Sequence, residues 1–270
     1  MGVAIGSLPV VAAILFDLDE TLIVDEPAAH AAFVATAAFA GSRHDIDVAA
    51  LAAGARERAR ELWHAAPTHP YCKRIGMSSW EGLWCRFDGE QAEVCALRDW
   101  SISYRREAWG LALTDQGVRD DELAAQLGER FGVERRLRHE AFTDALPAIA
   151  KLRASHRLAL VTNGASCLQR EKLGACGLGE YFDAVVVSGD LGLGKPAAEI
   201  FTRALDQLGV EAGETIMVGD SLQRDVAGAS ALGMRAVWVN RGGERRPGGH
   251  ARASEVSTLS ELPAALRDLA

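Results

Sequence analysis

The chain has 270 residues, of which 49% are hydrophobic and 24% are charged, so it is long enough and apolar enough to bury a sizeable core. Its formal net charge of −8 argues against a general nucleic-acid binder or a binder of anionic membranes. The five cysteines are odd in number and form no CxxC pair, which predicts neither a disulfide framework nor a zinc site and favours the reducing cytoplasm.

Short apolar runs rich in branched residues mark the predicted strands, and the first of them is 10–16. The others follow in the second half of the chain, at 157–162, 184–187, 215–218 and 235–239. Helical spacing predicts the helices between and after them, at 144–154, 166–176, 197–208, 222–232 and 260–269. This alternation is typical of βαβ units and predicts the α/β class, with a Rossmann-like parallel sheet that carries helices on both faces.

The stretch between the first strand and residue 140 has a different composition. It is rich in Ala, Glu, Arg and Leu at helical spacing and contains no strand-like run, so it predicts an inserted helical domain. We therefore assign 1–23 and 140–270 to an α/β core domain and 24–139 to a helical cap domain. Five of the six tryptophans fall in the insertion, where we expect them to pack in its core, and 64–79 is expected to form a loop.

Polar and charged residues collect where the predicted strands end. Because ligands of open parallel sheets bind beyond the carboxyl ends of the strands, we expect these side chains to lie together there. They are Asp17 and Asp19 after the first strand, Thr162 and Asn163 after the second, Lys195 in a glycine-rich loop, and Asp220 and Asp225 after 215–218. Four carboxylates at one edge repel one another unless a cation neutralises them, which predicts a metal site.

Carboxylate oxygens favour magnesium, which often bridges protein carboxylates and a substrate phosphate, so the pattern indicates phosphoryl transfer. A carboxylate can attack phosphorus, and a second carboxylate can protonate the leaving oxygen and then activate water. The D-x-D spacing of Asp17 and Asp19 places both groups on one face of an extended chain, within reach of the same substrate.

The motifs resemble those of the haloacid dehalogenase (HAD) superfamily hydrolases of the phosphatase kind. In chain order, DLDET at 17–21 matches the family's DxDxT, TNG at 162–164 its phosphate-binding Thr, GKP at 194–196 its Lys, and GDSLQRD at 219–225 its GDxxxxD. The helical insertion after the first motif resembles the family's cap. The resemblance implies a magnesium-dependent phosphomonoester hydrolase that acts through an aspartyl-phosphate intermediate.

The resemblance also implies a role for each matching residue. Asp17 would be the nucleophile, and Asp19 would be the general acid and base. Thr162 and the backbone N–H of Asn163 would bind the phosphoryl oxygens. Lys195 would offset the charge of the nucleophile and of the transferred group.

Magnesium would be held by the acids of the first and last motifs. Asp17 would ligate it through its carboxylate and Asp19 through its backbone carbonyl. Asp220 would be a direct ligand, and Asp225 either a ligand or an anchor behind the ligands.

Three other functions are compatible with parts of this pattern. A phosphomutase uses the same aspartyl phosphate and returns the group to its substrate, so release of free phosphate would distinguish the two. A dehalogenase of the same superfamily is disfavoured, because a leaving halide needs no proton and in those relatives the residue matching Asp19 is replaced. A catalytically silent binding protein on the same fold is the third, since fold alone does not establish function.

Specificity is expected to come from the insertion, because the core motifs recognise only the phosphate group and the metal. Within 64–80, Lys73, Arg74 and Trp80 are the candidates, since they can bind a second anionic group or stack on a ring. The expected partner is a small phosphorylated metabolite, with neither nucleic acid nor membrane, and the expected state is a monomer or homodimer. The segment 241–254 is expected to be a mobile surface loop.

Overall fold

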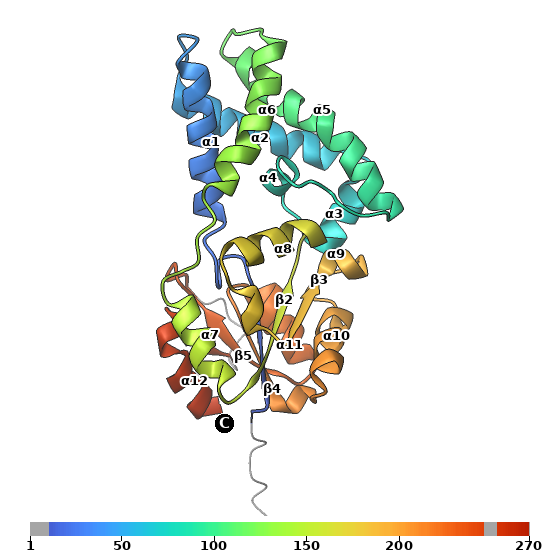
Figure 1. Cartoon of the computed structure of the whole chain (residues 1–270), viewed down its shortest axis with the longest axis vertical. Helices are drawn as coiled ribbons and strands as arrows, with labels where there is room; N and C mark the ends of the chain where they lie inside the picture. The colour runs from blue at the N-terminus through green and yellow to red at the C-terminus, as the bar shows by residue number, and fades with distance from the viewer. Residues whose placement is uncertain (1–10, 246–252, 270) are drawn as a thin grey trace, which may run out of the picture. The chain divides into compact units, whose positions relative to one another are not determined.

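The computed structural model describes residues 11–245 and 253–269, which form two compact units (Figure 1). The sheet unit consists of the described parts of Met1–Ile23, Ala141–Thr162 and Gly177–Ala270. The helical unit consists of Val24–Glu140 and Asn163–Cys176. The chain therefore enters the helical unit twice, once after each of the first two strands.

The sheet unit is built on six parallel strands. They are β1 (Ala13–Phe16), β2 (Arg157–Thr162), β3 (Ala184–Val187), β4 (Thr215–Gly219), β5 (Arg235–Val239) and β6 (Ser254–Val256), in the order β3-β2-β1-β4-β5-β6. The AILF sequence of β1 is fully buried, as expected for a central strand that is covered on both faces. The predicted parallel sheet is confirmed, and the short strand β6 is an addition to it.

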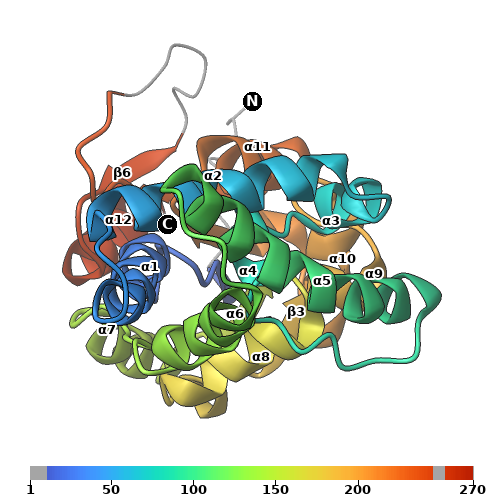
Figure 2. The same cartoon turned by 90° about the horizontal axis from the view of Figure 1, so that it is seen from above.

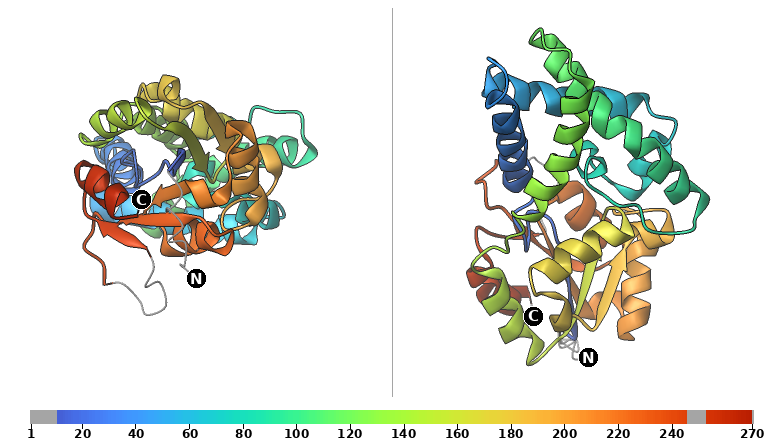
Figure 3. Two further views of the ribbon diagram at one scale, coloured as in Figure 1. Left: turned by 90° about the horizontal axis from the view of Figure 1, so that it is seen from below. Right: turned by 45° about the horizontal axis from the view of Figure 1, so that its top comes forward.

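Helices cover both faces of this sheet, as predicted. They are α7 (Ala145–Arg153), α9 (Ser188–Leu191), α10 (Ala198–Leu208), α11 (Ala227–Ala231) and α12 (Leu262–Leu269), together with the short turns η1 (Gly179–Tyr181), η2 (Ala212–Glu214), η3 (Leu222–Val226) and η4 (Leu259–Glu261). Figure 3 shows α7 in green and α12 in red on one side of the strands and α10 in orange on the other. The predicted helix 222–232 is divided into π-helical η3 and α11.

The helical unit contains four long helices and three shorter ones. They are α1 (Glu26–Gly41), α2 (Val48–Ala65), α3 (His69–Ile75), α4 (Ser79–Gly82), α5 (Ala92–Asp115), α6 (Asp121–Arg136) and α8 (Ser166–Ala175). Helices α1 and α5 each pack against both α2 and α6, so the four long helices form a closed ring (Figure 2). Two of the ring helices begin at an aspartate whose side chain accepts backbone N–H groups, Asp47 for α2 and Asp120 for α6.

The expected loop at 64–79 is wrong, because this segment contains the end of α2 and the whole of α3. Pro70 lies in the first turn of α3, where its missing N–H is not needed. Gly76 ends the helix in the left-handed conformation, with φ 71°. The sequence reads as a loop because proline and glycine stand close together around a very short helix.

Aromatic side chains fill the core of the helical unit. Trp63, Trp84 and Trp109 are buried there, which confirms their predicted packing role. The rings of Phe33 and Phe131 lie 4.4 Å apart between centroids, at a tilted angle. Among the described residues, no helix combines the length and the apolar character that a membrane crossing requires.

Helix α8 belongs to the helical unit, although the sequence analysis assigned its residues to the α/β core domain. Ala165 and Leu168 are buried in the same apolar cluster as the ring helices. The apolar face of α8 therefore completes the core of the helical unit.

Candidate active site

The carboxyl ends of three neighbouring strands bring the predicted site residues together. The last residue of β1 is paired with Leu160 of β2 and with Val218 of β4. Asp17 comes one residue beyond this level, and Thr162 and Asp220 come two residues beyond it. All three therefore lie at one edge of the sheet, as the strand pattern predicts.

Asp17 is held in one orientation by its neighbours. It is buried, and its backbone N–H donates to the carbonyl of Val218 at 3.0 Å. Its Oδ1 lies 2.5 Å from Nζ of Lys195, and the hydroxyl of Thr21 donates to its Oδ2 at 3.4 Å. A carboxylate fixed in this way is well placed to act as a nucleophile without first reorganising.

Asp220 is fixed through its backbone. Its N–H donates to the hydroxyl of Thr21 at 3.0 Å, and its carbonyl accepts the indole N–H of Trp238 at 2.7 Å. Thr21 thus connects the loops that carry Asp17 and Asp220. The sequence analysis gave no individual role to Thr21 or Trp238, although Thr21 belongs to the DxDxT motif.

Asp225 approaches the same point from the turn after β4. Its Oδ1 lies 2.7 Å from Nζ of Lys195, and its Oδ2 accepts the N–H of Ser221 at 2.9 Å. A Cβ at Gly219 would lie 2.3 Å from Oδ2 of Asp225, so only glycine leaves room for this carboxylate. The close approach explains the glycine of the GDSLQRD motif.

The three carboxylates form one cluster with more negative charge than Lys195 can neutralise. Ligand oxygens of Asp17, Asp220 and Asp225 all lie within 4.8 Å of one another. Burial raises the pKa of Asp220 to about 9, and repulsion by Asp17 and Asp225 acts in the same direction. Burial also raises the pKa of Asp225 to about 6, against the attraction of Lys195. This set of crowded oxygen donors fits a hard divalent cation, which would let all three stay ionised.

Lys195 is the positive charge within this cluster. Burial by itself lowers the pKa of Lys195, but Asp17 and Asp225 outweigh that effect and hold the pKa above its ordinary value. The ammonium group is therefore charged at neutral pH.

Asp19 follows Asp17 in a tight turn. It is half-buried and forms a bridge with Ile23, whose N–H donates to the carbonyl of Leu18 at 3.1 Å. Glu20 has the left-handed φ of 57° that the sharp turn requires. The turn keeps Asp19 at the same edge of the sheet as Asp17.

Arg241 connects this turn to Asp144 through hydrogen bonds. It donates to both carboxylate oxygens of Asp144, at 3.1 and 2.9 Å, and to the carbonyl of Thr21 at 2.9 Å. The expected mobile loop at 241–254 is therefore wrong at its start, and it is wrong at Ser254, where β6 begins. The part at 246–252 lies outside the described residues.

Asn163 belongs to the helical unit, although it follows Thr162 directly in the chain. It packs against Gly76, where a Cβ would lie 2.5 Å from Nδ2 of Asn163. Thr162, the last residue of β2, is buried in the sheet unit. The chain thus passes from one unit to the other in the middle of the predicted phosphate motif.

The three specificity candidates have different surroundings in the helical unit. Lys73 and Arg74 are exposed on α3, and Nη2 of Arg74 lies 4.0 Å from Oε1 of Glu93. Trp80 is half-buried, and its indole N–H donates to Oδ2 of Asp25 at 3.2 Å. Trp80 therefore forms a hydrogen bond within the helical unit, whereas the side chains of Lys73 and Arg74 lie at the surface of that unit.

The helical unit contains a cluster of buried charges, which the sequence analysis did not predict. It consists of Asp25, Glu81, Arg135 and Lys172, and we call it the Lys172 cluster. Nζ of Lys172 lies 2.8 Å from Oδ1 of Asp25 and 2.7 Å from Oε1 of Glu81. Nη2 of Arg135 lies 2.6 Å from the same oxygen of Asp25. Burial alone would raise the pKa of Asp25, but Lys172 and Arg135 hold it well below its ordinary value.

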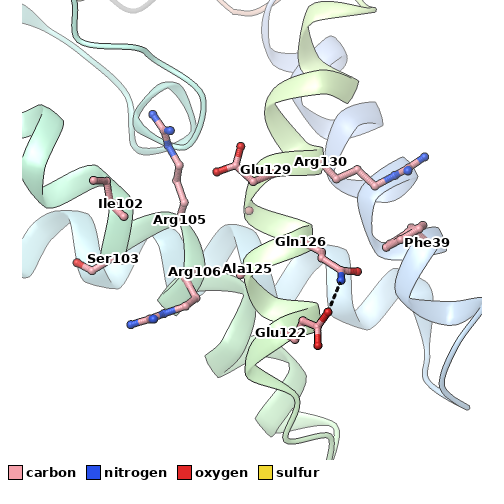
Figure 4. A pocket seen from close by; sticks show the side chains of 11 residues that line it. Phe39, Ile102, Ser103, Arg105, Arg106, Glu122, Ala125, Gln126, Glu129 and Arg130 are labelled. Carbon is pink, nitrogen blue, oxygen red and sulfur yellow. Dashed lines mark hydrogen bonds between the residues drawn. The ribbon is translucent and has the colours of Figure 1, made fainter.

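A surface pocket of about 680 Å³ opens on α5 and α6 of the helical unit (Figure 4). Several of its polar and charged side chains have partners of their own. Gln126 donates to Glu122 at 3.2 Å, Arg130 lies over the ring of Phe39, and Arg105 donates to the carbonyl of Cys85. The pocket holds no group of convergent carboxylates like that at the edge of the sheet.

Comparison with known proteins agrees with this geometry. The family model for haloacid dehalogenase-like hydrolases matches residues 11–233. The phosphoserine phosphatase of Thermus thermophilus is 40% identical over 230 residues, which cover 85% of this chain and 88% of that protein. The N-acylneuraminate-9-phosphatase of Mus musculus is 41% identical over 140 residues, so the match covers 50% of this chain and only 55% of that protein.

The fold is also that of a solved 2-haloacid dehalogenase from Pseudomonas syringae pv. Tomato DC3000. The two share 27% identity with a TM-score of 0.62, over 96% of this chain and 100% of that chain. The family match takes in every motif at the edge of the sheet, from Asp17 to Asp225. As its sequence predicts, the chain belongs to the haloacid dehalogenase-like hydrolases, and within that family it is an enzyme of the phosphatase type.

Proposed function

We propose that this chain is a magnesium-dependent phosphatase that hydrolyses small phosphomonoesters, with Asp17 as its nucleophile. The observation that carries the proposal is the buried Asp17 carboxylate, which lies 2.5 Å from Lys195 and clusters with Asp220 and Asp225. The experiment that tests it measures release of inorganic phosphate from a panel of phosphomonoesters in the presence of magnesium. Absence of phosphate release from every member would contradict the proposal.

In the first step, a carboxylate oxygen of Asp17 attacks phosphorus and the ester P–O bond breaks. Asp19 gives its proton to the departing oxygen, which leaves as an alcohol. The hydroxyl of Thr162, the N–H of Asn163 and the ammonium group of Lys195 hold the phosphoryl oxygens during the transfer. The product of this step is an aspartyl phosphate on Asp17.

In the second step, Asp19 acts as a base. It takes a proton from a water molecule, whose oxygen attacks phosphorus. The bond between Asp17 and phosphorus breaks, which restores the carboxylate and releases inorganic phosphate. Asp19 is then protonated again and ready for the next substrate.

Asp17, Asp220 and Asp225 would hold the magnesium ion, together with the backbone carbonyl of Asp19. When bound, magnesium supplies positive charge that offsets these carboxylates and the phosphoryl oxygens. The fit rests on the crowded oxygen donors and on the raised pKa values of Asp220 and Asp225.

Phosphoserine is the first substrate to test. It is supported by the name of the Thermus thermophilus relative, which matches most of both chains. Lys73 and Arg74 remain the proposed contacts to the substrate beyond its phosphate, since both are exposed on α3. Running the same panel with Arg74→Ala tests this, because the ranking of substrates should change only if Arg74 takes part in selection. We also propose that the protein is located in the cytoplasm.

The alternatives make different products. A phosphomutase would return the phosphoryl group to the substrate, so it would release little inorganic phosphate. A dehalogenase would release halide from 2-haloacids, which Asp19 disfavours because halide departs without a proton. A silent binding protein would do neither, although it could bind the same ligands.

We expect chelation of divalent metal to abolish phosphatase activity and added magnesium to restore it. The reason is that Asp17, Asp220 and Asp225 repel one another when only Lys195 offsets them. A binding readout complements the assay, because magnesium that binds the folded protein should raise the thermal midpoint of the metal-free protein, and the midpoint should rise further as the magnesium concentration increases. Asp220→Asn should weaken this rise. Full activity in excess chelator would contradict the metal requirement.

The Asp19→Asn variant should distinguish the role of proton donor from that of nucleophile, because it removes the proton donor and keeps Asp17. Without the proton of Asp19, departure of a basic alkoxide such as that of serine should slow far more than departure of p-nitrophenolate, by roughly 10²-fold or more. The measurement is single-turnover cleavage of phosphoserine and of p-nitrophenyl phosphate by the same variant. Equal losses for both substrates in the cleavage step would show that Asp19 is not the general acid.

A further inference from the structure

Two cysteines of the helical unit lie in sulfur contact. The Sγ atoms of Cys85 and Cys167 are 3.6 Å apart, and neither residue is in a disulfide. Cys85 lies just after α4, whereas Cys167 lies in the first turn of α8, so they are distant in sequence. The packing of α8 onto the helical unit is what brings them together.

The two thiols differ in exposure and acidity. Cys167 is partly exposed, and its hydrogen bond with Cys85 lowers its pKa to about 6, against the effect of burial. Backbone N–H groups of Asp88 and Phe87 also lower this pKa. Burial raises the pKa of Cys85 well above its ordinary value, so Cys85 remains a thiol. One partner is thus a partly exposed thiol with a lowered pKa and the other a buried thiol at contact distance, which is the arrangement of an attacking and a resolving cysteine.

We propose that Cys85 and Cys167 are a redox pair, in which hydrogen peroxide oxidises Cys167 and Cys85 then joins it in a reversible disulfide. This modification site is separate from the phosphatase residues. It depends only on contacts within the helical unit and not on the proposed function.

The chemistry balances with peroxide as the only oxidant. The Cys167 thiolate attacks one peroxide oxygen, the O–O bond breaks, and hydroxide leaves as sulfenic acid forms on Cys167. The Cys85 sulfur then attacks the Cys167 sulfur and expels hydroxide, which takes the Cys85 proton and becomes water. Two electrons pass from the two sulfurs to one peroxide, and a dithiol reductant reverses the change.

Formation of the disulfide should displace the segment that carries Asn163 of the phosphate motif, because the two are close in sequence. The S–S bond is about 2.0 Å long, so the sulfurs must approach by more than an ångström from their present contact. Cys167 is only four residues after Asn163, and Gly164, with φ 139°, lies between them. The pull on the first turn of α8 therefore acts on the short segment that carries Asn163. If the proposed function holds, kcat should fall by about tenfold or more and recover with dithiothreitol.

The test is peptide mapping of the full chain after peroxide treatment and alkylation. The expected result is a peptide pair joined through Cys85 and Cys167, loss of two of the five thiols, and full recovery with dithiothreitol. Cys167→Ser should abolish the crosslink, whereas Cys176→Ser, a partly exposed cysteine nine residues further along, should keep it. Because Cys85 is buried, Cys85→Ala serves as the second variant if Cys85→Ser fails to fold.

Sulfinic acid on Cys167 without a crosslink, or a crosslink to Cys72, Cys95 or Cys176, would overturn the proposal. So would peroxide resistance of both thiols in a folded protein. Mapping reads the disulfide directly, so a failure of the phosphatase assay leaves its result unaffected. An unchanged kcat in fully crosslinked, active enzyme would overturn the link between the disulfide and the segment of Asn163.

Discussion

Asp17→Asn is expected to abolish phosphatase turnover, with a loss of about 10³-fold or more in kcat/KM. The amide nearly keeps the shape of the carboxylate but is a poor nucleophile toward phosphorus. It also removes the negative charge that lies 2.5 Å from Lys195. The assay is phosphate release from the best substrate of the panel, together with acid quenching to look for phosphate bound covalently to the peptide that contains residue 17. The variant should yield no such phosphopeptide.

The matched control is Asp206→Asn, which makes the same chemical change at an exposed position on α10. It should leave kcat/KM unchanged. Circular dichroism should show both variants folded, since Lys195 of the first variant still has Asp225 at 2.7 Å. Near-normal turnover by a folded Asp17→Asn protein would mean that another group attacks phosphorus.

Lys172→Met should destabilise the protein by about 3–5 kcal/mol, because it removes one partner from a buried ion-pair network. Nζ of Lys172 contacts both Asp25 and Glu81, and all three side chains are almost fully buried. Methionine is nearly as long as lysine but uncharged, so Asp25 and Glu81 stay buried without the ammonium group that contacts both of them. Urea denaturation followed by tryptophan fluorescence suits this test, since five of the six tryptophans lie in the helical unit.

Arg170→Met provides the matched control, because Arg170 is exposed on the same helix as Lys172. A surface substitution of this kind should change stability by no more than about 0.5 kcal/mol. Adding Glu81→Gln to Lys172→Met should recover part of the loss, since it removes a carboxylate that has lost its counter-ion. If Lys172→Met is no more destabilising than Arg170→Met, the Lys172 cluster does not stabilise the helical unit.

The sheet could be predicted because its strands are buried on both faces and therefore read as continuous apolar runs. The edge strand β6 escaped prediction, since its three residues SEV carry no such signal. Helix α3 escaped because seven residues are too few for helical periodicity to appear. Local sequence thus indicates long or deeply buried elements and is silent on short ones.

The candidate site could be predicted for a related reason. Parallel strands carry whatever follows them to one edge, so the positions of Asp17, Asp220 and Asp225 follow from the strand assignments alone. The Lys172 cluster had no comparable signal, because Asp25, Glu81, Arg135 and Lys172 come from four separate segments of the chain. A single sequence does not show which distant charges will pair, nor that Arg241 will hold the turn containing Thr21.

The chain enters the helical unit twice, and this constrains the order in which the two units can fold during synthesis. Ala13 of β1 pairs with Arg157 and Thr215, so the first strand emerges from the ribosome long before either neighbour exists. The ring helices come next and bring Arg135 to Asp25, but Asp25 and Glu81 lack the ammonium group of Lys172 until α8 has been made. Domains fold as they are synthesised, and pairings distant in sequence form slowly. We therefore expect the helical unit to be finished once Cys176 has emerged, and the acidic site around Asp17 to be assembled later, after β4 and Asp225 have emerged.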